Sequence, residues 1–89
     1  MAQKIPKDKF DKMTKDYQKN NPGQTHAVRF DRASIEAILA SNPKEIAVYF
    51  SEENKTKTVA LIGIDSTDTL MYDTATNLGG LCPPNCPNP

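Results

Sequence analysis

The sequence predicts a single α+β domain in which two helices pack on a small mixed sheet, in the order α-β-α-β-β with a possible short fourth strand. Two stretches, Lys7–Asn20 and Arg32–Ala40, carry apolar residues at helical spacing. Two apolar runs rich in β-branched and aromatic residues, Ile46–Phe50 and Val59–Ile64, flank the polar segment Ser51–Thr58, which is a hairpin pattern. A chain of 89 residues has room for one such domain.

The first expected helix is amphipathic and lysine-rich. Phe10, Met13 and Tyr17 fall on one of its faces. Acidic and basic residues four apart, such as Asp8 and Lys12, support an exposed helix. Because aspartates are interleaved with the lysines, we interpret this charged face as solvated rather than as an arm that binds nucleic acid.

The middle of the chain reads as a strand, a short helix and a second strand. Thr25–Phe30 predicts the first strand, and Asp31 is a good N-cap for the helix Arg32–Ala40. This succession suggests a right-handed crossover in which the first strand runs parallel to the strand of Ile46.

Both strands of the predicted hairpin are apolar on both faces, and Gly63 within the second strand suggests a bulge or a close backbone approach. Strands of this kind are usually covered on both sides. Two short helices cover only one side, so we expect the C-terminal segment or another subunit to close the other. The predicted core consists of Phe10, Met13, Val28, Phe30, Ile35, Ile38, Leu39, Ile46, Val48, Phe50, Leu61 and Ile62.

The C-terminal part of the sequence loses periodicity. Thr69–Tyr72 could form the short fourth strand. We therefore divide the chain into an α+β domain, residues 1–73, and a tail rich in glycine, proline and cysteine, residues 74–89.

Cys82 and Cys86 are the only cysteines, and three interpretations of them stay open. They could form a disulfide, which belongs to oxidising compartments and here would close a small loop. They are weak candidates for half of a metal site, because a structural zinc needs four ligands. They could also be free thiols. Redox catalysis ranks last, since the spacing is Cys-x3-Cys rather than Cys-x-x-Cys.

No other group of residues forms a recognisable catalytic or cofactor-binding motif, so we expect no catalytic residue and no cofactor. His26 has no motif-supported nucleophile or acid near it in the sequence. Asp65, Asp68 and Asp73 lack the order of a calcium-binding loop, and turn chemistry explains them better. The glycines fit no nucleotide-binding loop.

The charge balance argues against a nucleic-acid partner, and the lack of long apolar runs argues against a membrane span. Lysine plus arginine number 11, as do aspartate plus glutamate, whereas strong nucleic-acid binders usually carry a positive excess. No run approaches the roughly 20 apolar residues of a membrane span. No signal-peptide pattern is visible at the N-terminus, so we expect a cytoplasmic protein without a membrane partner.

Four segments carry a family resemblance: NNPGQTHAVRFDRASIEAILA, IAVYF, ALIGID and the terminal CPPNC. In this order they resemble a group of small uncharacterised bacterial proteins of the Bacteroidetes type, which have a C-terminal Cys-Pro-Pro-x-Cys tail. The resemblance covers most of the chain. It implies that Cys82, Pro83, Pro84 and Cys86 belong together as a unit, and it implies no catalytic residue.

The sequence thus favours a small non-enzymatic module for protein interaction or self-assembly, such as a homodimer. The alternative is a metal-binding or redox-responsive thiol protein that acts through the C-terminal Cys82 and Cys86.

Overall fold

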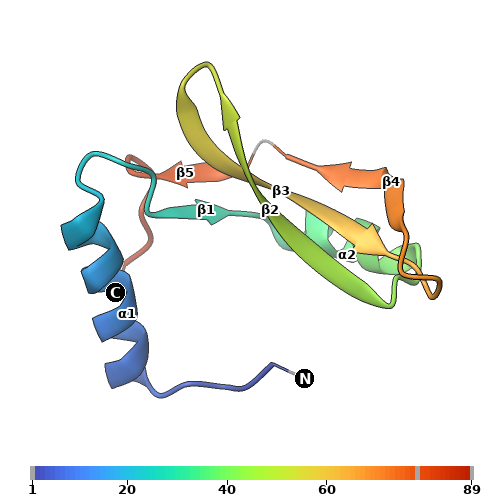
Figure 1. Ribbon diagram of the computed structural model, residues 1–89, viewed down its shortest axis with the longest axis horizontal. Helices are drawn as coiled ribbons and strands as arrows, with labels where there is room; N and C mark the ends of the chain where they lie inside the picture. Colours follow the sequence, from blue (N-terminus) through green and yellow to red (C-terminus); the bar gives the residue numbers. More distant parts are fainter. Residues whose placement is uncertain (1, 78, 89) are drawn as a thin grey trace.

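The computed structural model describes residues 2–77 and 79–88, and this part of the chain contains two helices and five strands (Figure 1). In chain order they are α1 (Lys7–Asn20), β1 (Ala27–Arg29), α2 (Arg32–Ala40), β2 (Glu45–Glu53), β3 (Thr56–Ile64), β4 (Leu70–Thr76) and β5 (Gly80–Cys82). The predicted α+β class and the order α-β-α-β-β are confirmed, and β4 and β5 extend the order.

The hairpin β2–β3 is the longest paired structure of the molecule. Its register is unbroken from Glu45 opposite Ile64 to Glu53 opposite Thr56. The turn residues Asn54 and Lys55 have φ angles of 50° and 65°. Two consecutive residues in this left-handed region make the kind of two-residue turn whose twist matches that of the two strands.

Strand β4 completes an antiparallel sheet in the order β2-β3-β4. Its register with β3 shifts between Leu61 and Gly63, so the expectation of a bulge and a close approach at Gly63 is confirmed. The bulge brings in Thr74, whose hydroxyl accepts a hydrogen bond from Gly63 N at 2.8 Å and donates one to Met71 O at 2.7 Å. The domain boundary expected after Asp73 falls inside β4.

The predicted parallel crossover between the first strand and the strand of Ile46 is wrong. β1 instead pairs antiparallel with β5 in a separate two-stranded sheet, with Val28 opposite Leu81. β2 takes β3 as its partner through a tight local turn, and the C-terminal segment occupies β1. Part of the expected tail is therefore a structural strand.

Helix α2 packs on β3 and β4 and supplies the most buried side chain, Ile38, which is 2% exposed. The helix begins where predicted, because the Asp31 carboxylate accepts a hydrogen bond from Ser34 N at 2.9 Å. Leu61, Ile62 and Cys82 are also buried. The core prediction is thus confirmed for Ile38, Leu61 and Ile62.

Several residues predicted for the core are exposed. Helix α1 buries none of its residues and lies at one end of the sheets rather than on a face (Figure 1). Strand β2 pairs with β3 and forms one of the two edges of its sheet, and β4 forms the other. The prediction of core positions is therefore wrong for Phe10, Met13, Leu39, Val48 and Phe50, whereas Val28, Phe30, Ile35 and Ile46 are half-buried.

Candidate interaction surface

Helix α1 exposes its apolar face. Its charged residues form the ion pairs Lys7–Asp11 and Lys12–Asp16, with N–O distances of 2.6 and 2.7 Å. The bond from Lys7 lowers the pKa of Asp11 below its ordinary value. These pairs hold the polar side of the helix in water, while three large apolar residues on α1, Phe10, Met13 and Tyr17, are each about half exposed.

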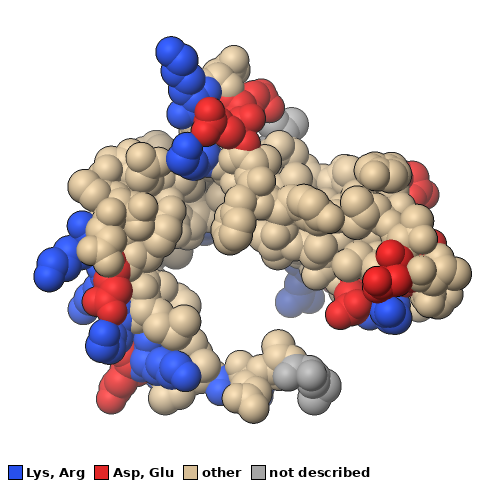
Figure 2. Space-filling model, in the orientation of Figure 1, with Lys and Arg blue, Asp and Glu red and all other residues tan. Residues whose placement is uncertain are grey.

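A groove of about 630 Å³ lies between α1, the segment that leads into β1, and the end of the β2–β3 hairpin. Met13 and Tyr17 line it from the helix, and Phe50 and Val59 line it from the hairpin. The Ser51 hydroxyl oxygen, also at this groove, is buried without a hydrogen-bond partner among the described residues. Figure 2 shows how α1 and the N-terminal segment curve away from the sheets and leave the molecule open on one side.

Strand β2 carries the most exposed apolar side chain in the described chain. Phe50 is 93% exposed, and its neighbours Val48 and Tyr49 are each about half exposed. These residues come from the apolar run that the sequence assigns to the core, and here they face solvent because helix α2 packs on β3 and β4 rather than on β2. Val48 and Phe50 lie on one face of the strand and Tyr49 on the other, so β2 exposes apolar surface on both faces.

Positive and negative charges are divided unequally between the N-terminal 24 residues, which include α1, and the rest of the chain. The first 24 residues contain six lysines and three aspartates, a net charge of +3, and the other residues carry five basic and eight acidic side chains, a net charge of −3. Figure 2 shows the blue lysines along α1, at the left of the view. The zero overall charge therefore hides two segments of opposite sign, which can attract each other between molecules.

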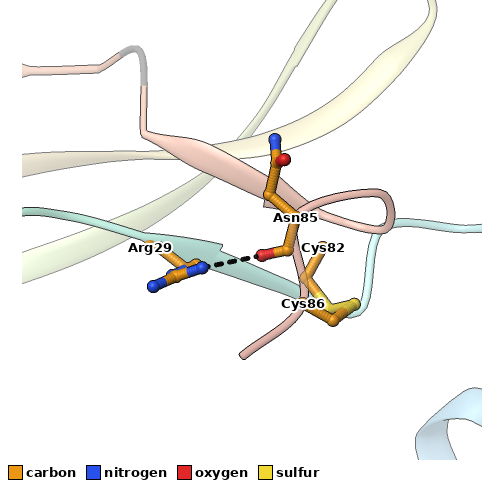
Figure 3. Close-up of a disulfide and its surroundings, with 4 residues drawn as sticks. All are labelled: Arg29, Cys82, Asn85 and Cys86. Carbon is orange, nitrogen blue, oxygen red and sulfur yellow. Dashed lines mark hydrogen bonds between the residues drawn. A yellow bond between two sulfur atoms is a disulfide. The ribbon is translucent and has the colours of Figure 1, made fainter. Parts of the chain in front are cut away.

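Cys82 and Cys86 form a disulfide that anchors the last described residues to β5 (Figure 3). Arg29 on β1 supports this loop, because its guanidinium donates to Asn85 O at 3.3 Å. The backbone N–H of His26 donates to Cys82 O at 2.6 Å. Of the three interpretations of the cysteines, the structure shows the disulfide, and it places both residues beside β1.

The other candidate residues hold local structure. His26 is partly buried, and Asp31, a conceivable acid partner for it, is instead engaged in capping α2. Asp65 Oδ1 accepts hydrogen bonds from the Thr67 hydroxyl at 2.7 Å, from Thr67 N at 2.9 Å and from Thr69 N at 3.0 Å. The turn interpretation of Asp65 is therefore confirmed.

Within residues 2–77 and 79–88, no three histidine, cysteine, aspartate or glutamate side chains gather closely enough to hold a metal ion. No helix in the same part of the chain is long and apolar enough to cross a membrane.

Comparison of the chain with family models, with curated proteins and with solved structures finds no match. The resemblance to the Bacteroidetes-type proteins therefore stays a prediction, and the functional argument rests on the surface described above.

Proposed function

We propose that this protein is a small non-enzymatic module that works by self-assembly, with a second copy of the chain as its partner. The observation that supports this most directly is the exposure of Val48, Tyr49 and Phe50 on β2, one of the two edge strands of the sheet. An apolar run of this composition is stable in water when another surface covers it.

Two further features favour a second copy over an unrelated partner. The apolar side chains of α1 are about as exposed as Val48 and Tyr49 of β2, so one chain offers two apolar surfaces that a copy can cover. The positive helix and the negative remainder of the chain also give two copies complementary charges.

The oligomeric state tests this proposal. We expect native mass spectrometry and light scattering to find a dimer at micromolar concentration. Phe50→Ser should weaken the dimer, because it removes the largest exposed apolar side chain of the edge. Tyr72→Ser is the matched control: Tyr72 is an exposed aromatic residue on β4, away from this edge. A wild-type protein that is monomeric up to millimolar concentration would contradict the proposal.

The disulfide supports one second candidate, a redox-responsive protein that acts through Cys82 and Cys86. Disulfides persist in oxidising compartments, and the cytoplasm, which is the location expected from the sequence, tends to reduce them. Reduction would free the last residues from β5 and also release two thiolates as metal ligands.

A double replacement tests this candidate. If Cys82→Ser with Cys86→Ser leaves both the oligomeric state under oxidant and reductant and the zinc content of the reduced protein unchanged, the redox and metal-binding candidate is wrong.

A further inference from the structure

We propose that β2 pairs antiparallel with β2 of a second copy in one defined register, with Val48 on the two-fold axis. The two three-stranded sheets then join into a single six-stranded sheet. This inference rests on the proposed self-assembly and names its interface.

Two hydrogen bonds show which way the backbone of β3 points. Gly63 N donates to Thr74 on β4, and Lys57 O accepts from the Thr25 hydroxyl at 2.6 Å. Neither of these partners lies on β2. Because backbone groups alternate along an antiparallel strand, the odd-numbered residues of β3 from Lys57 to Gly63 turn their N–H and C=O groups away from β2.

The same alternation fixes the orientation of β2. The residues opposite Lys57, Val59, Leu61 and Gly63 on β3 are Glu52, Phe50, Val48 and Ile46. Their N–H and C=O groups therefore point to the outer edge. No other strand of the described chain pairs with that edge. An edge of this kind is a template for another strand.

Charged side chains protect this edge only at the ends of β2, at Glu45, Glu52 and Glu53. Natural proteins block free edges with proline, inward-pointing charges, bulges or a covering loop. Strand Glu45–Glu53 contains no proline and no lysine, and its register with β3 has no bulge. Apolar residues occupy its centre and acidic residues its ends, so the strand favours pairing along its middle.

Any symmetric register with a residue of β2 on the axis lets the outward backbone groups of two β2 strands bond to each other, and the registers centred on Val48 and on Tyr49 differ in how they pair apolar and charged residues. With Val48 on the axis, Ile46 lies opposite Phe50 of the copy. Glu52 of the copy then comes level with Lys44, the residue just before β2, whose backbone N–H is bonded to Ile64 O of β3. With Tyr49 on the axis, Ile46 lies opposite Glu52. The first register pairs apolar residues with each other and opposite charges with each other, which stabilises a sheet.

The second register has a further cost, because it places Glu45 opposite Glu53 of the copy. Like charges directly opposite each other destabilise a sheet. Lys44 and Glu52 are both exposed, and their ion pairs within the chain, Lys44 with Glu45 and Asp68 and Glu52 with Lys57, lie at the surface, where such pairs contribute little stability. The charges therefore select the register with Val48 on the axis.

Charge reversal tests the register. Lys44→Glu or Glu52→Lys alone places like charges opposite each other twice per dimer, and we expect each to raise the dimer Kd about tenfold. The double variant Lys44→Glu with Glu52→Lys restores opposite charges across the interface and should return the Kd to within about threefold of wild type. It restores neither contact within the chain, because Asp68 and Lys57 are unchanged.

The outcomes separate this inference from the proposed function. A monomeric wild type overturns both. A wild-type dimer that ignores the single reversals, or one that the double variant fails to restore, overturns the β2 register and leaves self-assembly to another surface such as the α1 groove.

A backbone variant tests the edge itself. The Val48 N–H points outward, so Val48→Pro removes no hydrogen bond to β3 but blocks pairing on the axis. We expect a folded monomer by circular dichroism and light scattering, whereas Val48→Thr, which keeps the N–H, should still dimerise. A folded Val48→Pro variant that dimerises as tightly as Val48→Thr contradicts the proposal, and if Val48→Pro fails to fold, the charge-reversal series decides.

Discussion

At the scale of single residues, the contact between β3 and β4 at Gly63 leaves no room for a side chain. A Cβ atom at this position would lie 3.0 Å from Pro43 Cβ, 3.2 Å from Met71 Sδ and 3.2 Å from Thr74 Oγ1. Gly63 is buried in the sheet, and its N–H is the donor to Thr74. Glycine is therefore required here by the close approach of the β4 bulge and the chain before β2.

We predict that Gly63→Ala destabilises the protein by about 1–3 kcal/mol, because an added methyl group overpacks a filled site. Urea unfolding followed by circular dichroism measures this effect. Gly80→Ala is the control, since a Cβ atom there would lie 3.8 Å from Arg29 Cβ, an ordinary contact distance. Equal stability of the two variants would show that the close approach at Gly63 carries no strain.

Asp65 is a second residue whose local contacts have a measurable consequence. The hydroxyl of Thr67, followed by the N–H groups of Thr69 and Thr67, lowers the pKa of its carboxyl below the ordinary value of 3.8. A carboxyl with a lowered folded-state pKa stabilises the protein above its unfolded-state pKa. This contribution is lost as the pH falls through the folded-state pKa.

We therefore predict that Asp65→Ala is less stable than wild type at pH 7 and that this difference shrinks as the pH falls below 3.8 and the wild-type carboxyl becomes protonated. Chemical unfolding at pH 7, 5, 3 and 2 measures the difference. Thr67→Val, which lacks the hydroxyl donor, should show part of the same effect. A difference that is as large at pH 2 as at pH 7 would contradict this account of the turn.

At the scale of elements, local patterns in the sequence predict where helices and the hairpin begin and end. The bounds of α1 and α2 are those of the predicted segments, because helical periodicity and the Asp31 cap act within a few residues. The pairing partner of β1, by contrast, could not be predicted from a local pattern. Its three residues pair with β5, more than 50 positions later, and such pairing depends on tertiary packing that periodicity does not contain.

The exposure of β2 is a second feature that the pattern alone did not predict correctly. The apolar sequence pattern of a central strand does not differ from that of an exposed edge strand. The two-sided pattern from Ile46 to Phe50 did indicate that more surface is needed than two helices provide. A stronger signal would have come from counting residues back from the Asn54–Lys55 turn, which shows which backbone groups point outward.

The pairing of β1 with β5 leads to a prediction about the disulfide. The bond between Cys82 and Cys86 closes a loop with a sequence separation of 4, so it stabilises the chain by at most about 2 kcal/mol in the loop-entropy model. We expect reduction to speed amide hydrogen exchange in β1 and β5 and to leave β2, β3 and α2 unchanged. The double variant Cys82→Ser with Cys86→Ser should match the reduced protein, and faster exchange throughout the sheet would contradict this local role.

At the scale of the whole molecule, the chain is more open than its length requires. The radius of gyration is 14.5 Å, whereas a compact domain of 89 residues has about 12 Å. Among the described residues the buried apolar side chains are Ile38, Leu61, Ile62 and Cys82, a small core. A core of this size gives marginal stability, so covering β2 with a second copy would add a large share of the total.

This openness predicts that thermal stability depends on protein concentration, because a dimer is stabilised by mass action and a monomer is not. Raising the concentration 100-fold stabilises the dimer by about 2.7 kcal/mol. For two chains of 89 residues, with about 2.1 cal/mol/K of unfolding entropy per residue, the expected rise in Tm is about 7 °C.

Differential scanning calorimetry measures this rise at protein concentrations of about 2 and about 200 μM, which differ 100-fold and suit a micromolar Kd. The monomeric Val48→Pro variant should show the same Tm at both concentrations. A wild-type Tm that does not change would mean that the open, weakly packed chain is stable by itself, and that the exposed edge of β2 contributes nothing to its folding.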